Sequence, residues 1–197
     1  MGTIPMRILL LSTSIICMIL FVRAMSGHFR VIDKVPKRKY LLDILGMANY
    51  IIFLKAFAYS SDASENFQYL LAESILLVSL VLFLWTRRTS QEADLSYVFS
   101  DDIPQLHLTK GPYLYIRHPF YTSYLAFWIG LLVYSFSMYS LALTVIIFVL
   151  YRDAASDEER KFMHSGLSFQ YSRYKRTTGM FLPKLMTFGH KHGSHMI

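Results

Sequence analysis

The feature that most constrains this chain is a run of 32 residues without a formal charge, from Phe120 to Tyr151. As one helix the run would be about 48 Å long, well beyond the roughly 30 Å hydrocarbon core of a bilayer. It is too short for two full-length spans and a turn. The run therefore predicts a tight hairpin of two short helices, each extending past the run into polar sequence, the second through Arg152 and Asp153. We expect a short, poorly exposed turn near three serines: Ser135, Ser137 and Ser140.

Three further apolar segments precede this run, over about residues 4–22, 41–59 and 70–85. The chain is 54% hydrophobic and 17% charged, whereas soluble domains carry about a quarter charged residues. We therefore predict an all-α, polytopic membrane bundle of about five transmembrane helices in one domain, residues 1–197. Its expected parts are a three-helix part (1–88), a hairpin-containing motif region (106–183) and a disordered tail (189–197).

The basic residues indicate how the bundle is oriented. The first loop, the third loop and the C-terminal tail hold 18 of the 20 Lys and Arg residues, the exceptions being Arg7 and Lys55. Five crossings would place these three segments on one side, which the positive-inside rule makes cytoplasmic, with the N-terminus outside. Membrane topology thus explains the net charge of +7. We therefore expect the lipid bilayer to be the partner of the basic residues, and we expect no binding of nucleic acid. The short chain suggests a prokaryotic inner membrane.

Other features of composition and pattern add smaller constraints. Cys17 is the only cysteine, which excludes a disulfide or a cysteine-based metal site, and we predict no metal. From Asp157 onward the sequence predicts an amphipathic helix on the cytoplasmic membrane surface. Its apolar residues at helical spacing are Phe162, Met163, Leu167, Tyr171 and Tyr174.

The segment from Gly111 to Tyr121 has the residues of an anion-binding site. Pro119 suits the first turn of a helix, and a helix start exposes unpaired N–H groups with a partial positive charge. Arg117 and His118 add to that charge, so an anion is expected to bind here. The alternative is that these two residues mark the membrane interface and the neighbouring tyrosines form an aromatic belt.

Acidic residues follow the last apolar segment, against the basic bias of that face. A hairpin would return Glu158 and Glu159 to the level of Arg117 and His118. The site would then have one wall for anions and one for cations. This arrangement suits a zwitterionic ligand, such as an amino acid moiety or a sulfonium.

The order of these motifs resembles the isoprenylcysteine carboxyl methyltransferase family, within the broader phospholipid methyltransferase-like group. The motifs are Gly-Pro-Tyr-x-x-x-Arg-His-Pro-x-Tyr, an uncharged hairpin, Glu-Glu, and a Tyr-x-x-Tyr segment ending in Phe-Leu-Pro at 181–183. The resemblance implies a membrane enzyme that uses S-adenosylmethionine without a Rossmann domain, and the chain has no GxGxxG. Ser123 and Ser168 stand where many members have Gly.

The resemblance also implies roles for individual residues. Arg152 and Arg173 are the candidate catalytic residues, as contacts for an anionic acceptor. The implied cofactor-binding residues are Tyr115, Arg117, His118, Pro119, Tyr121, Glu158 and Glu159.

The resemblance implies carboxyl O-methylation of an isoprenylcysteine-like, lipophilic substrate. It agrees with the chemistry of the residues, since a carboxylate is ionised at neutral pH and needs no general base, and no residue is an obvious base. A phospholipid N-methyltransferase or a thiol S-methyltransferase is the alternative with the same cofactor. An NADPH-dependent sterol reductase-like protein and a non-catalytic membrane protein are further alternatives. Asp101 and Asp102 lie in the loop of residues 90–110, which we expect to help shape the acceptor pocket.

Overall fold

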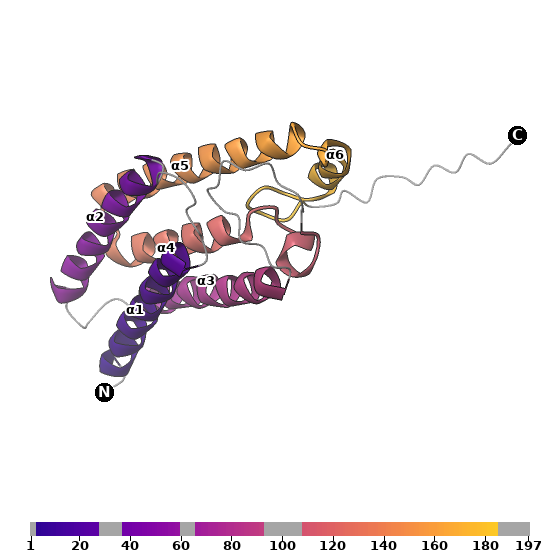
Figure 1. The fold of residues 1–197 in the computed structure, drawn as a ribbon. Helices are drawn as coiled ribbons and strands as arrows, with labels where there is room; N and C mark the ends of the chain where they lie inside the picture. Colours follow the sequence, from indigo (N-terminus) through magenta and orange to yellow (C-terminus); the bar gives the residue numbers. More distant parts are fainter. Residues whose placement is uncertain (1–2, 28–36, 60–65, 93–107, 185–197) are drawn as a thin grey trace, which may run out of the picture.

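A computed structural model of the chain describes residues 3–27, 37–59, 66–92 and 108–184 (Figure 1). These residues form six α-helices and one 3-10 helix and contain no β-strand. The elements are α1 (Thr3–Gly27), α2 (Lys37–Tyr59), α3 (Asn66–Glu92), η1 (Gly111–Leu114), α4 (Pro119–Ser135), α5 (Met138–Met163) and α6 (Ser168–Thr177). The predicted all-α membrane bundle is confirmed. Asp101, Asp102 and the tail 189–197 lie outside the described residues.

Contacts between the helices show that α1 to α5 alternate in direction along the chain. The pairs that set the directions are Arg7–Phe57 and Ser14–Tyr50 for α1 and α2, Thr13–Glu73 and Phe21–Phe83 for α1 and α3, Gln68–Val133 and Ser79–Ser123 for α3 and α4, and Asn49–Ser140 and Arg38–Asp157 for α2 and α5. The end of α3, the start of α4 and the end of α5 therefore lie together, beside η1 and α6 (Figure 1). The side of the membrane that this end occupies stays a prediction.

Within the described residues, four helices are long and apolar enough to cross a membrane, namely α1, α2, α3 and α5. The fifth, α4, has 17 residues and a length of about 25 Å, at the short limit for a span. It packs along α3, where Gly130 allows close approach: a Cβ there would lie 3.0 Å from a methyl carbon of Leu76. Small residues of this kind let membrane helices pack closely.

The predicted hairpin is present, with its turn at Phe136 and Ser137 between α4 and α5. Ser140 is inside α5 and buried. Two details of the prediction are wrong. The turn is open, since Phe136 is 88% exposed, and apolar side chains at this end suit contact with lipid. The first helix also does not extend into the polar sequence before the run: it begins at Pro119, the residue expected in its first turn, because the residues that precede it form η1 and a β-bridge.

The polar residue Asn49 in the second span is explained by packing. It is fully buried, its amide donates to Thr144 (3.1 Å), and its carbonyl accepts from Ser140 (2.7 Å). Both partners belong to α5, so this one side chain joins α2 to the hairpin.

Substituting Asn49→Leu is expected to lower the free energy of unfolding by about 1–2 kcal/mol, because two interhelical hydrogen bonds are lost and their partners stay buried. Unfolding in detergent with increasing denaturant would measure this change. Ser74→Ala is the control, since the exposed Ser74 hydroxyl bonds only to Leu70 of its own helix. Equal stability of the two variants would contradict the role given to Asn49.

The C-terminal segment departs from the single amphipathic helix that the pattern predicts. α5 continues to Met163, a turn follows, and α6 begins at Ser168. The turn allows Phe162 to stack on Tyr171, with ring centroids 4.5 Å apart and planes inclined by 7°. Apolar residues expected on one membrane-facing stripe therefore pack against each other across the turn.

Candidate active site

The backbone before α4 is held by the segment that follows α6. The N–H of Arg117 donates to the carbonyl of Gly179 (2.8 Å), and the N–H of His118 donates to that of Met180 (3.1 Å). The Thr122 hydroxyl donates to the carbonyl of Phe181 (3.0 Å). The first two bonds satisfy the N–H groups of the two residues that precede α4, which the helix leaves unpaired. They make the C-terminal segment part of the site.

On its other side this backbone is fixed to α3 through η1. Gly111 has φ of 55° and lies against Thr89, so a side chain would be strained and crowded there. The Tyr113 hydroxyl forms a hydrogen bond with Ser90 (3.1 Å), and Tyr174 donates to the Tyr113 carbonyl (2.6 Å). Burial raises the pKa of Tyr113 to about 12, so its hydroxyl stays protonated.

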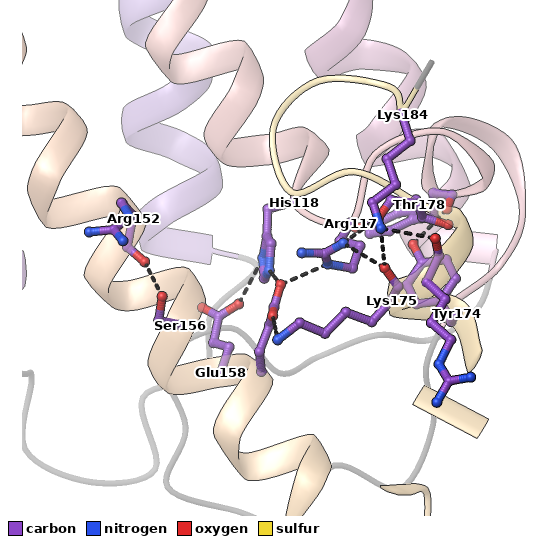
Figure 2. A network of polar contacts seen from close by, with 12 residues as sticks. Arg117, His118, Arg152, Ser156, Glu158, Tyr174, Lys175, Thr178 and Lys184 are labelled. Carbon is purple, nitrogen blue, oxygen red and sulfur yellow. Dashed lines mark hydrogen bonds and ion pairs between the residues drawn. The ribbon is translucent and has the colours of Figure 1, made fainter. Parts of the chain in front are cut away.

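Three charged side chains meet at the centre of the site (Figure 2). Arg117 Nε donates to Glu159 Oε1 (2.7 Å), and Lys175 Nζ lies 2.6 Å from Glu159 Oε2. The Arg117 guanidinium also donates to the carbonyl of Thr178. The side chains of Arg117 and Glu159 are 6% and 3% exposed, so this is a buried ion pair. Together with Lys175, it connects the segment before α4 to α5 and α6.

His118 lies between the two carboxylates of α5 (Figure 2). Its Nδ1 is 3.4 Å from Glu158 Oε2, and its Nε2 is 3.3 Å from Glu159 Oε1. Tyr121 donates a hydrogen bond to the other oxygen of Glu158 and stacks on the imidazole. The Glu158 side chain is 26% exposed, so it is the more accessible of the two acids.

A sequence model of the phospholipid methyltransferase family matches residues 67–168. The chain belongs to this family. The matched region runs from α3 to the start of α6 and so contains η1, Arg117, His118, the hairpin and both glutamates. No curated protein matches the chain in a sequence search. The family consists of methyltransferases, which agrees with the broader group named from the motifs; specificity for an isoprenylcysteine stays a prediction.

The structure brings most of the sequence-predicted site residues together. Arg117, His118, Tyr121, Glu158 and Glu159 are joined by the contacts above, and Pro119 opens α4 as expected. Tyr115 is 55% exposed beside them. Their roles toward a ligand stay predictions.

The two candidate catalytic arginines, Arg152 and Arg173, lie outside this network of contacts. Arg152 and Arg173 are both exposed, and neither guanidinium forms a hydrogen bond or ion pair within the described residues. Arg152 is on α5, seven residues before Glu159 and about 10 Å along the helix axis, whereas Arg173 is on α6. Both are therefore open to solvent or lipid, as a contact for an acceptor requires.

Sequence reasoning missed Lys175 and the carbonyl groups of residues 178–180. Lys175 belongs to the same tail as Tyr171 and Tyr174, and its charge was assigned to the basic face alone. The available signal was the spacing: in a helix Lys175 lies one turn after Tyr171, on the face that carries the Tyr-x-x-Tyr pair.

The surroundings of His118 give the site a dependence on pH. Burial disfavours the charged imidazolium, but the hydrogen bonds and negative charges of Glu158 and Glu159 outweigh it and raise the pKa of His118 above 6.5. A group whose pKa is raised by folding stabilises the fold fully below its unfolded pKa. That contribution is lost as the pH rises through the folded pKa.

We therefore expect the difference in Tm between the wild type and His118→Gln to be largest near about pH 6 and to shrink as the pH rises above the raised pKa. Thermal unfolding of both proteins in the same detergent between about pH 5.5 and pH 9 would measure the difference. A difference that stays constant across this range would show that the imidazolium contributes nothing to stability.

Proposed function

We propose that this protein transfers a methyl group from S-adenosylmethionine to a lipophilic acceptor that reaches the site from the membrane. The observation that carries the proposal is the convergence of Arg117 and His118 with Glu158 at the end of the bundle, in a chain of the phospholipid methyltransferase family. Both signs of charge face one site there, as a zwitterionic amino acid moiety requires.

The residues present fit this methyl donor. Glu158 is accessible and can accept hydrogen bonds from an ammonium group or from ribose hydroxyls. His118 lies against the second oxygen of Glu158 and fixes the orientation of this carboxylate, and the stacked rings of Tyr121 and Tyr151 (5.1 Å) provide a flat apolar surface. Both oxygens of Glu159 already bind this chain's own cations. We therefore assign Glu159 a positioning role, holding Arg117 and Lys175 in place.

S-adenosylmethionine supplies the leaving group: the bond between the methyl carbon and sulfur breaks as the bond to the acceptor forms, and the electron pair returns to sulfur. The protein then has to orient the two reactants and exclude water. Buried aromatic rings below Tyr121, namely Tyr124 and Tyr151, keep the membrane side of the site free of water.

The identity of the acceptor distinguishes two candidate reactions. Carboxyl O-methylation of an isoprenylcysteine-like substrate needs no general base and was our expectation from the motifs. N-methylation of a phospholipid amine is supported by the family to which the chain belongs. For both reactions the resemblance of the motifs implies Arg152 and Arg173, which are exposed, as contacts for an anionic group of the acceptor.

Two measurements on purified protein test the proposal. Calorimetry should show binding of S-adenosylmethionine and no binding of NADPH. Transfer of a radiolabelled methyl group to lipid-extractable product should follow when the protein is placed in vesicles that contain phosphatidylethanolamine, or is given a farnesylated cysteine with a blocked amine. Binding of NADPH in preference would support the reductase alternative, and binding of neither would support a non-catalytic protein.

A further inference from the structure

Two buried hydrogen-bond donors near the site have no partner within the described part of the chain. They are Nε of Arg87, on α3, and the hydroxyl of Tyr124, on α4. Tyr124 is only 4% exposed, so water does not readily satisfy it. A buried donor without a partner destabilises the fold, and such a donor is retained more readily where a ligand supplies the missing acceptor.

Both groups belong to the same region between α3 and α4. Residues 83, 87 and 90 follow at helical spacing and share one face of α3. Phe83 packs against the Tyr124 ring (centroids 6.1 Å apart), and Ser90 bonds to the Tyr113 hydroxyl (3.1 Å). Arg87 therefore lies between the residue that touches Tyr124 and the residue that holds η1.

This region adjoins the proposed site for the methyl donor. The Tyr124 ring lies 5.9 Å from that of Tyr151, which in turn stacks on Tyr121 at 5.1 Å. The Tyr121 hydroxyl donates a hydrogen bond to Glu158. The rings of Tyr121, Tyr151 and Tyr124 therefore form one continuous group between the accessible Glu158 carboxylate and the Tyr124 hydroxyl. A ligand at Arg87 and Tyr124 would thus lie beside the methyl donor, on the α3 side of these rings.

The chemistry of the two groups defines what binds. A guanidinium only donates hydrogen bonds and is always charged, and a tyrosine hydroxyl donates readily to an oxyanion. We propose that Arg87 and Tyr124 form a subsite for the anionic group, a phosphate or a carboxylate, of the lipophilic acceptor. This inference rests on the proposed function and assigns the acceptor's anionic group to these two buried donors, in place of the exposed Arg152 and Arg173 that the motifs imply.

Arg88 provides a matched control on the same helix. It is the next residue, carries the same charge, and is exposed on α3. A general attraction of anionic lipid to a basic surface would weaken equally when Arg87 or Arg88 is replaced. A specific subsite would respond to Arg87 alone.

The first test measures binding and does not depend on catalysis. Wild type, Arg87→Gln, Arg88→Gln and Tyr124→Phe are titrated in neutral detergent with a short-chain phosphatidylethanolamine, with a farnesylated cysteine whose amine is blocked, with the matching diacylglycerol, and with inorganic phosphate. We expect Arg87→Gln to weaken binding of at least one of the two lipids that carry an anionic group about tenfold or more. Tyr124→Phe should weaken binding of the same lipid about threefold, and Arg88→Gln should bind it as the wild type does. The diacylglycerol, which lacks the anion, should not distinguish the variants.

Two outcomes of this titration would contradict the proposal. The subsite would be overturned if Arg87→Gln unfolds at the wild-type temperature and binds both lipids that carry an anionic group with the affinity of the wild type. Arg87-dependent binding of inorganic phosphate with no preference for lipid would show a site for a soluble anion, and would overturn the assignment to the acceptor.

A kinetic measurement separates this inference from the proposed function. Arg87→Gln should raise the KM for the acceptor about tenfold and leave the affinity for S-adenosylmethionine unchanged, and Arg87→Lys should recover part of the loss. If the wild type binds no S-adenosylmethionine, the proposed function fails, while the binding test still decides the anion subsite. If the wild type methylates and Arg87→Gln keeps the acceptor KM, the subsite fails and the proposed function stands.

Discussion

The substitution Glu159→Gln is expected to lower methyl transfer by about a hundredfold or more and to lower the free energy of unfolding by about 3–5 kcal/mol. Glutamine keeps the size of the side chain and removes its charge. Arg117, which is 6% exposed, then loses its buried counter-ion, and Lys175 loses the carboxylate at 2.6 Å. Breaking a buried ion pair from one side is costly because the remaining charge stays desolvated.

Asp157→Asn is the control for this experiment. Asp157 lies two residues earlier on α5, loses the same charge on substitution, and pairs with Arg38 and Arg160 at the exposed surface. Surface pairs of this kind contribute at most about 1 kcal/mol. Activity should be measured at a temperature where circular dichroism shows both variants folded, so that a lost site is distinguished from an unfolded protein. If Glu159→Gln has wild-type activity and stability, Glu159 has no role in the site.

The central geometry of the site was predictable because it follows from chain length. An uncharged run of 32 residues is too long for one span, so the chain must turn back, and a hairpin returns Glu158 and Glu159 to the level of Arg117 and His118. The structure confirms this, with His118 3.4 Å and 3.3 Å from the two carboxylates. Hydropathy also predicted the first three helices, although the helices extend beyond the apolar segments, most of all α3, which ends at Glu92 where the segment ends at residue 85.

Other parts of the site depend on where distant segments pack, which periodicity does not encode. The pairing of Arg117 with Gly179 joins residues about sixty positions apart and involves only backbone atoms. The turn between α5 and α6 was missed because the residues on both sides keep helical spacing, and only the stacking of Phe162 on Tyr171 shows why the helix breaks. The open turn at Phe136 was missed because a lipid-facing residue and a buried residue have the same apolar composition.

The substitution Gly179→Ala is expected to have the second largest effect. A Cβ at Gly179 would overlap the carbonyl oxygen of Leu182 and lie 2.9 Å from its carbonyl carbon. These are backbone atoms, so no side-chain rotation relieves the clash and the segment after α6 has to shift. The shift would break the bonds from Arg117 and His118 to residues 179 and 180.

We expect this variant to lose about 2 kcal/mol of unfolding free energy, since two backbone hydrogen bonds contribute about 1 kcal/mol each, and to lose about a hundredfold in methyl transfer. Thermal unfolding and the radiolabelled-methyl assay would measure the two losses. Gly166→Ala is the control, because a Cβ there meets no atom within 4 Å, and it should behave as the wild type. The comparison of stability with activity separates two explanations of the C-terminal segment. If the segment only covers the end of the bundle, Gly179→Ala should destabilise the protein but keep its activity at temperatures where the protein is folded. If the segment positions Arg117 and His118, activity should fall even there.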